Sequence, residues 1–290
     1  MGRIISRIIK VVRYRFLVIA GIFPYLLGSS IAYHNTASFH LDYFTVGLAG
    51  ILFALLAIEY LNEYFDAEVG TDQMFSLERR PVSPYYKFIG FGALLVAFLT
   101  ALFLTSRRGY PIMGFSIIGA LAIIFYVGPP VKLSYRGWGE ITIALTYGLF
   151  MTMGSFYLQT QKIVLDVLQA SSPVCLFLVA ITLANEIPDY YQDKLAGKKN
   201  IVVRLGRHNT SRLFGAVLLA TYALLCFELL TGLLPPLSWL IMLTLPLAFR
   251  SYRIAVKYHD QPAEFIPAIR GAIVLYLVAI SALSLGYVFT

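Results

Sequence analysis

The sequence predicts an all-α polytopic membrane protein, a fold class indicated by its composition and by its apolar segments. Of its 290 residues, 59% are hydrophobic and 13% are charged, whereas a water-soluble domain has about 25% charged residues. Apolar stretches of roughly 18 residues or more recur along the chain, and each is long enough to cross a bilayer core. Because backbone polar groups in lipid must be satisfied within the segment, these stretches should be helices.

The chain begins with a basic amphipathic segment, residues 1–15, which contains five Lys and Arg residues, Arg13 among them. Such a segment resembles the start of a signal peptide, but no clear small-residue cleavage site follows it. We therefore expect an interfacial segment that leads into the first span.

Nine candidate spans follow along the chain. They occur near residues 16–34, 43–64, 86–105, 110–128, 138–158, 172–187, 211–232, 235–250 and 267–289. The eighth is short, and a tilted or partly interfacial position would suit it. We expect a single membrane-embedded domain over residues 1–290, with two pseudo-repeated halves at about 16–128 and 138–250 and a last span at 267–289.

The distribution of basic residues predicts the orientation of the chain in the cell membrane. If the N-terminus is cytoplasmic and the spans alternate, 20 of the 23 Lys and Arg residues fall on the cytoplasmic side. The exterior side then holds only Arg107, Arg108 and Lys162, and the C-terminus at Thr290 is exterior. The net charge of +8 is explained by basic loops that face anionic lipid, so nucleic acid is not an expected partner.

An acidic pattern, Asn-Glu-x-x-Asp, closes the second and the sixth predicted spans. It runs from Asn62 to Asp66 and again from Asn185 to Asp189. Residues four apart share one face of a helix, and both spans end on the cytoplasmic side. The repeat indicates an internal duplication in which each half contributes an acidic helix end.

Two further aspartates extend these clusters and predict a Mg²⁺ site. Asp193 follows Asp189 by four residues, whereas Asp72 lies beyond Gly70, so the second span should end between Asp66 and Asp72. Carboxylates at a membrane boundary are costly unless they are paired or bound to metal, and Mg²⁺ takes one or two of them together with substrate phosphates. Ordinary solvated helix ends are the alternative. The predicted metal ligands are Asp66, Asp72, Asp189 and Asp193, with Asn62 and Asn185 assisting at the metal or the substrate.

Basic residues in the cytoplasmic loops are candidates to bind the phosphates of a substrate, since they would offset its negative charge. The candidates are Arg13, Arg79, Arg80, Lys132, Arg136 and Lys198. Positive-inside topology alone also explains most of them. The loop that carries Arg79 and Arg80, residues 70–82, is expected to close over bound substrate and exclude water.

Three blocks of the chain resemble the UbiA superfamily of intramembrane prenyltransferases. They are Asn62 to Asp72, Tyr126 to Glu140 with its Gly-Pro-Pro and Arg-Gly-Trp-Gly sequences, and Asp189 to Asp193 followed by Ala-Gly-Lys-Lys-Asn-Ile-Val-Val-Arg-Leu-Gly. The resemblance covers nearly the whole chain. It implies nine helices around a central cavity that opens to lipid, and Mg²⁺-dependent transfer of a polyprenyl group from an isoprenoid diphosphate. Asp66, Asp189, Tyr126 and Lys132 are then the expected catalytic residues.

The sequence Asn-Glu-Tyr-Phe-Asp-x-x-x-Gly-x-Asp most resembles the menaquinone branch, which prenylates 1,4-dihydroxy-2-naphthoate; 4-hydroxybenzoate is a second aromatic acceptor of this kind. Three departures exist. Glu63 replaces an Asp of that branch, Arg80-Pro81-Val82 is similar to other branches, and the spacing from Tyr126 to Lys132 is longer than in some members. A non-aromatic acceptor, as in archaeal ether-lipid synthesis, is therefore an alternative.

Two other classes of membrane protein are alternatives. A secondary transporter also has internal repeats and intramembrane acids, but its acids should lie near the middle of the membrane rather than at one face. A phosphatidyltransferase of the CDP-alcohol type would carry an Asp-Gly-x-x-Ala-Arg signature, which this sequence lacks. The four histidines fall in predicted loops and have no assigned role.

Overall fold

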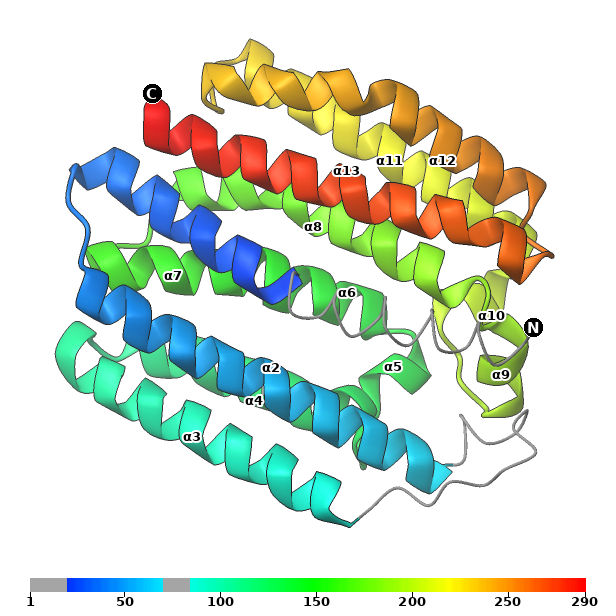
Figure 1. Ribbon diagram of the computed structural model, residues 1–290, viewed down its shortest axis with the longest axis horizontal. Helices are drawn as coiled ribbons and strands as arrows, with labels where there is room; N and C mark the ends of the chain where they lie inside the picture. The colour runs from blue at the N-terminus through cyan, green and yellow to red at the C-terminus, as the bar shows by residue number, and fades with distance from the viewer. Residues whose placement is uncertain (1–19, 70–83) are drawn as a thin grey trace.

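The computed structural model describes residues 20–69 and 84–290, with the side chains of residues 67–69 left aside. Arg13, Asp72, Arg79 and Arg80, together with the expected lid at residues 70–82, lie outside the described residues. Within the described ranges the chain is helical and contains no strand, which confirms the predicted all-α class. The long helices run side by side in Figure 1.

The first half of the chain forms long helices joined by short loops. They are residues 20–36, α2 (Leu41–Val69), α3 (Tyr85–Arg108), α4 (Pro111–Val127), the short α5 (Leu133–Arg136), and a continuous helical segment made of α6 (Gly139–Ile143), η2 (Ala144–Phe150) and α7 (Met151–Thr160). The middle part of that segment, η2, is π-helical. Turn residues separate the helices: Gly109 ends α3 with a φ of 107°, and Pro111 begins α4.

The second half is also made of long helices joined by short loops, with two short helices inserted after α8. Its elements are α8 (Leu165–Glu186), α9 (Tyr190–Leu195), α10 (Ile201–Leu205), α11 (Arg207–Leu230), the 3₁₀-helix η3 (Pro236–Thr244) that continues into α12 (Leu245–Lys257), and α13 (Pro262–Phe289). With η3 included, the predicted eighth span is longer than expected and covers 22 residues.

Among the described residues, seven helical segments are long and apolar enough to cross a membrane. Two predicted spans do not meet that length. Helix α4 has 17 residues, and the described part of the first helix covers residues 20–36. The structure therefore supports a multi-pass membrane protein, and the count of nine spans and the two repeated halves stay predictions.

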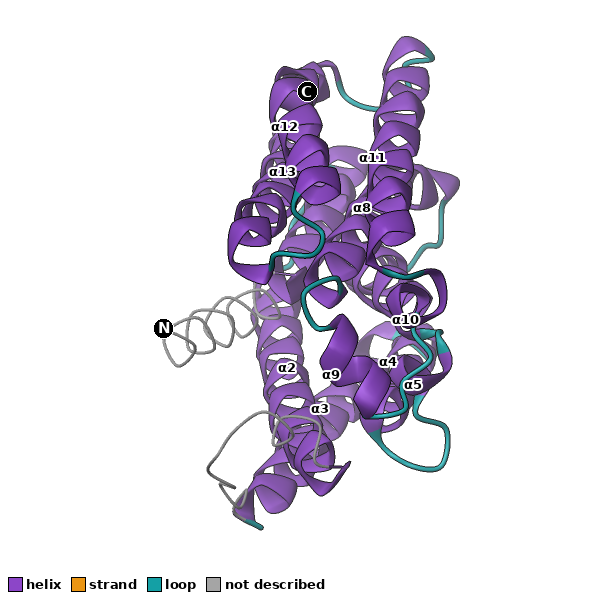
Figure 2. Ribbon diagram, turned by 90° about the vertical axis from the view of Figure 1, so that its right-hand side faces the viewer, coloured by secondary structure: helices purple, strands orange, loops and turns teal. Residues whose placement is uncertain are grey.

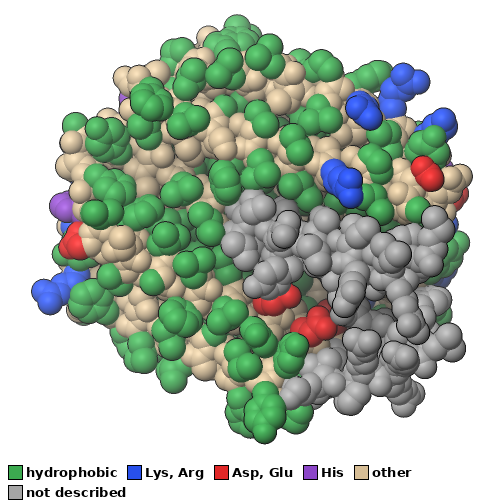
Figure 3. Space-filling view, in the orientation of Figure 1, with side chains coloured by type: hydrophobic (Ala, Val, Ile, Leu, Met, Phe, Trp, Pro, Cys, Tyr) green, Lys and Arg blue, Asp and Glu red, His purple; other side chains and the backbone are tan. Residues whose placement is uncertain are grey.

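Burial differs strongly between the helices. In α8, 67% of the most apolar window is buried inside the bundle, against 17% in α2, and α8 packs on α11, α13 and η2. The exposed side chains of the outer helices are mostly apolar, as lipid contact requires. Figure 3 shows hydrophobic side chains over most of one face, with several Lys and Arg side chains near its right-hand edge.

The bundle has two ends of different character. The end of α2 and the helices α5, α9 and α10 lie at one end, here called the site end, which Figure 2 shows from the front. The C-terminus lies at the other end, here called the opposite end. There Arg108 is buried and donates hydrogen bonds to the carbonyls of Leu158 (2.7 Å) and Gln159 (2.5 Å), which close the last turn of α7.

Candidate active site

The first acidic cluster lies on an unbroken helix. Asn62 and Asp66 stand one turn apart on α2, which is described as far as Val69. The predicted end of this helix between Asp66 and Asp72 falls at the edge of the described residues and stays a prediction. The hydroxyl of Tyr135 donates to Oδ1 of Asp66 at 3.4 Å. Glu59 and Glu63 belong to the same part of α2, and both have further contacts.

The second acidic cluster is divided between two helices. Helix α8 ends at Glu186, residues 187–189 form a turn, and α9 begins at Tyr190. Pro188 explains the break, because proline has no N–H and clashes with the preceding turn of a helix. The expectation that Asn185 and Asp189 share the face of one helix is therefore wrong. Asp189 and Asp193 do stand one turn apart, with the N–H of Asp193 donating to the Asp189 carbonyl at 2.9 Å.

Asp193 is held by two neighbours in the loop that follows α9. Lys198 Nζ lies 2.9 Å from its Oδ1, and Asn200 Nδ2 donates to its Oδ2 at 2.8 Å. The side chains of Lys198 and Asp193 are only 12% and 10% exposed, so the pair is largely shielded from water. Lys198, predicted to bind substrate phosphate, thus lies directly beside a predicted metal ligand.

Tyr135 connects the two clusters. It is buried at 9% exposure, it donates to Asp66 on α2, and Lys198 Nζ lies 5.2 Å from its ring centroid. Lys132 Nζ lies 5.3 Å from the same centroid, and the Tyr135 carbonyl accepts from the N–H of Lys199 at 2.8 Å. Tyr135 therefore bonds the carboxylate of Asp66 directly and is related to Asp193 through Lys198, which contacts both.

The loop between α4 and α6 is shaped by local bonds. Lys132 has a left-handed backbone conformation with a φ of 50°, and Ser134 Oγ donates to the Tyr126 carbonyl at 2.8 Å. Arg136 is exposed, and its guanidinium donates to the Pro130 carbonyl at 3.2 Å. Lys132 thus lies beside Tyr135. The guanidinium of Arg136 contacts its own loop, whereas its carbonyl accepts from Arg204 of α10.

Three residues at this site received no role from the sequence: Tyr135, Asn200 and Glu140. Asn200 is the N-cap of α10, accepting from Val203 N–H at 2.9 Å while it also binds Asp193. Glu140 is fully buried and accepts from Ile201 N–H at 2.9 Å. The Asn that precedes Ile-Val-Val is an N-cap signal readable from sequence, but the contacts of Tyr135 and Glu140 arise only from the tertiary fold.

The residues present fit Mg²⁺ if the ion is shared with a phosphate-bearing substrate. In the parts of the chain that the structure describes, no group of three or more His, Cys, Asp or Glu side chains is close enough to enclose a metal ion. Mg²⁺ does not need such a cage, since it binds through one or two carboxylates plus phosphate oxygens and water. Asp66, Asp189 and Asp193 offer these hard oxygen donors, and Asn62 stands one turn from Asp66 on α2.

An apolar cavity of about 190 Å³ lies between α2, α3, α4 and the η2–α7 segment. Its lining reaches Ile123, one helical turn from Tyr126, and Ala54, about two turns from Asn62. From there it extends toward the opposite end, where Tyr25 and Leu158 line it. Gly119 faces open space in this region, because a Cβ added there would meet no atom within 4 Å.

The chain matches known proteins over most of its length. A model described as the UbiA prenyltransferase family matches residues 21–287. A 2-carboxy-1,4-naphthoquinone phytyltransferase of Synechocystis is 28% identical over 245 residues, covering 83% of this chain and 80% of the relative. A 1,4-dihydroxy-2-naphthoate octaprenyltransferase of Bacillus subtilis is 24% identical over 258 residues, covering 87% and 82%.

Solved structures support the same fold. A UbiA homologue from Aeropyrum pernix aligns with a TM-score of 0.67 at 13% identity, covering 91% of this chain and 95% of that one. A UbiA homologue from Archaeoglobus fulgidus bound to GPP and Mg²⁺ aligns with a TM-score of 0.59 at 15% identity, covering 95% and 99%. The chain therefore belongs to the UbiA prenyltransferase family and is a membrane-embedded prenyltransferase related to the menaquinone-pathway branch.

Proposed function

We propose that this enzyme transfers a polyprenyl group from an isoprenoid diphosphate to an aromatic quinone precursor, such as 1,4-dihydroxy-2-naphthoate or 4-hydroxybenzoate, with Mg²⁺. The observation that carries the proposal is Tyr135, which contacts Asp66 of the first cluster and lies beside Lys198, the partner of Asp193 in the second. A buried ring that bonds the first acidic cluster and lies beside two cations, one of them paired with the second cluster, forms a suitable receptor for a metal-bound diphosphate.

One set of residues would hold the metal, and a second set would stabilise the diphosphate. Bound Mg²⁺ would neutralise the phosphate oxygens and weaken the C–O bond of the prenyl diphosphate. Asp66, Asp72, Asp189 and Asp193 would hold the metal, with Asn62 and Asn185 beside it. Lys132 and Lys198 would stabilise the leaving diphosphate, and Arg13, Arg79, Arg80 and Arg136 are further candidates.

The reaction breaks the C–O bond to the diphosphate and forms a bond between the allylic carbon and the electron-rich acceptor. The acceptor then loses a proton or CO₂, and inorganic diphosphate leaves. An allylic cation reacts with water, so the site must be dry. The faces of Tyr135 and Tyr126 are suited to stabilise positive charge near the reacting carbon.

The apolar cavity is suited to receive the prenyl chain. It begins one turn from Tyr126 and continues between α2, α3 and α4 away from the charged site. The hydrophobic effect favours a hydrocarbon chain in such a cavity. With the diphosphate at the site end, the chain would extend along the helices toward Tyr25 and Leu158.

The aromatic acceptor is proposed from the relatives, two of which are named for naphthoquinone or naphthoate substrates. The decisive experiment incubates purified enzyme with Mg²⁺, a labelled prenyl diphosphate and a panel of acceptors. Prenylated dihydroxynaphthoate or hydroxybenzoate is the expected product. Transfer only to a glycerol-phosphate lipid would favour the ether-lipid alternative, and no transfer to any acceptor would contradict the proposal.

We also propose the orientation, with the site end and the N-terminus cytoplasmic and the C-terminus exterior. The described residues of the opposite end carry only three basic residues, Arg107, Arg108 and Lys162, which suits an exterior face. Nine spans in one domain, with two pseudo-repeated halves, complete this proposal. Labelling of single cysteines placed at each terminus in intact cells tests it, and two termini on the same side would contradict nine spans.

A further inference from the structure

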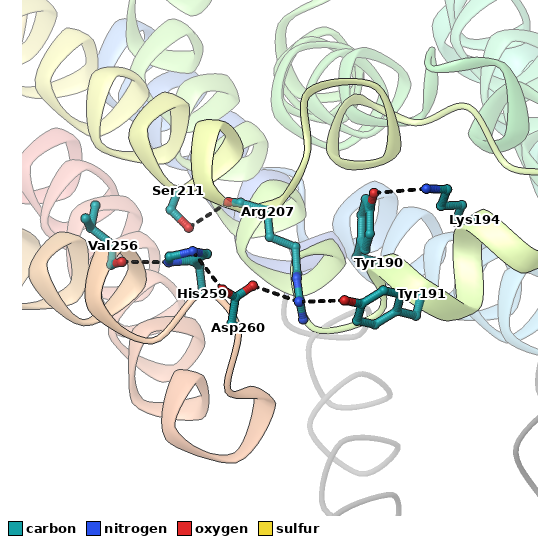
Figure 4. A network of polar contacts seen from close by, with 8 residues as sticks. All are labelled: Tyr190, Tyr191, Lys194, Arg207, Ser211, Val256, His259 and Asp260. Carbon is teal, nitrogen blue, oxygen red and sulfur yellow. Dashed lines mark hydrogen bonds and ion pairs between the residues drawn. The ribbon is translucent and has the colours of Figure 1, made fainter.

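Arg207, the first residue of α11, joins three segments at the site end (Figure 4). Its guanidinium lies 2.7 Å from Oδ1 of Asp260, in the loop between α12 and α13, and donates to the hydroxyl of Tyr191 on α9 at 3.1 Å. The same guanidinium lies 4.5 Å from the ring centroid of Tyr191 and 5.6 Å from that of Tyr190. The Arg207 side chain is only 11% exposed.

Helix α9 depends on such side-chain contacts for its position. It has six residues and packs mainly against α10, which is also short. One side of α9 carries Asp193, which is held by Lys198 and Asn200. Tyr190 and Tyr191 are held by Arg207. A short helix with few neighbouring helices has low local stability. These two sets of contacts, together with the packing of Tyr190 on the main core, therefore determine where the carboxylates of Asp189 and Asp193 lie.

The contact is specific to arginine. A planar guanidinium can stack on an aromatic face and donate in its own plane to a hydroxyl and a carboxylate together, which an ammonium group cannot do. Asp260 is in turn oriented by His259, whose Nε2 lies 3.1 Å from Asp260 Oδ2 and whose Nδ1 contacts the Val256 carbonyl at 2.8 Å. The α12–α13 loop thus orients the carboxylate of Asp260, and this carboxylate in turn holds the guanidinium of Arg207.

We propose that Arg207 is a positioning residue for diphosphate binding: it holds α9 against the α12–α13 loop and thereby keeps Asp189 and Asp193 in position on the side of Lys198 and Tyr135. Arg207 acts through Tyr190 and Tyr191 and does not touch the substrate. This inference rests on the proposed function, since it takes the second acidic cluster as part of the diphosphate site. It assigns the effect of Arg207 to the diphosphate substrate and not to the acceptor.

The test measures binding of geranyl diphosphate with Mg²⁺ to the purified full-length enzyme by calorimetry, together with the KM for each substrate and the Tm. Arg207→Ala should raise the Kd and KM for the diphosphate about tenfold, or about 1.4 kcal/mol, with the acceptor KM unchanged. The Kd and KM of Arg207→Lys for the diphosphate should fall between those of the wild type and those of Arg207→Ala. Arg212→Ala removes an exposed arginine from the same helix and should match the wild type.

A double-mutant cycle completes the design. Asp260→Ala should have a smaller effect than Arg207→Ala, because Asp260 is 61% exposed and solvent weakens its ion pair. The double variant should be no worse than Arg207→Ala alone. The inference is overturned if Arg207→Ala leaves the diphosphate Kd unchanged, or if it raises the KM for both substrates and lowers the Tm alike. Failure of the wild-type enzyme to bind geranyl diphosphate would instead overturn the proposed function.

Discussion

The two acidic clusters share one sequence pattern and differ in how the fold supports them. Asn62 and Asp66 lie on α2, a single helix of 29 residues, so their relative position is fixed by helix geometry. Asn185 and Asp189 are separated by the break at Pro188, and Asp193 lies on the six-residue α9. The same residues thus form a rigid cluster in the first half and, in the second, a cluster that depends on neighbouring side chains.

The largest expected effect tests whether both clusters belong to one site. Asp66→Ala and Asp189→Ala should each lower the transfer rate at least about 10³-fold, because each removes a carboxylate from the diphosphate site, while the protein still folds and inserts. Rates with labelled prenyl diphosphate and Mg²⁺ provide the measurement. Glu264→Ala, an exposed acid of α13, is the matched control. Near-normal turnover in either Asp variant would show that the two clusters do not serve one site.

The next effect concerns Tyr135, which connects the clusters. Tyr135→Ala removes the ring that lies beside Lys132 and Lys198, and kcat should fall about 100-fold. Tyr135→Phe keeps the ring and removes the hydroxyl that makes the long 3.4 Å bond to Asp66, so kcat should fall only about threefold. Equal losses in the two variants would show that the hydroxyl, and not the ring, is the important group.

A cavity-filling variant tests whether the prenyl chain binds in the apolar cavity of the first half. Gly119→Leu adds a side chain where a Cβ meets no atom within 4 Å, so it should fill the cavity without a clash. Turnover with long prenyl diphosphates should fall about tenfold relative to geranyl diphosphate, since part of the apolar seat is lost. Gly92→Leu, at an exposed glycine with equally open surroundings, is the control. An unchanged preference for chain length would place the chain elsewhere.

The smallest effect sharpens the description of the second cluster. Asn200→Ala removes both the N-cap of α10 and the hydrogen bond to Asp193. Stability should fall by about 1 kcal/mol, and the Mg²⁺ concentration for half-maximal rate should rise about threefold. Asn200→Ser keeps a side-chain oxygen that can cap α10 but loses the amide that bonds Asp193, so it should restore the Tm without restoring the Mg²⁺ response. Recovery of both the Tm and the Mg²⁺ response would show that Asn200 acts only as a helix cap.

Much of this architecture could be predicted from the sequence. Long apolar runs predict membrane helices because lipid allows few alternatives. The break in the second cluster could also be predicted, since Pro188 disfavours a continuous helix. The repeated Asn-Glu-x-x-Asp pattern instead favoured the interpretation that both clusters lie on equivalent helix ends. The described ranges leave the ligand role of Asp72 and the lid as predictions.

The remaining features depend on contacts between distant segments, which no local pattern reports. The guanidinium of Arg136 bonds the carbonyl of Pro130, and the phosphate-binding role of Arg136 stays a prediction. Tyr135 lies within a recognised block, but only the fold brings it to Asp66. The network of Arg207, Tyr191 and Asp260 joins residues from three loops or helix ends, and basic residues there were interpreted only as a sign of topology.

The π-helical segment η2 has a consequence for how this chain tolerates insertions and deletions. Each residue turns a helix by about 100°, and a π-turn accommodates an extra residue within an otherwise regular helix. Deleting one residue between Ala144 and Phe150 would therefore remove the wide turn and leave the two flanking helical parts in nearly the same rotation, so Glu140 would still reach α10 while Arg108 holds the α7 end. Deleting one residue from the regular helix α7 would instead rotate one end of the segment by about 100° relative to the other. The chain thus has one place in this segment, invisible in a hydropathy plot, where its length can change by one residue without turning the charged end of the bundle away from its far end.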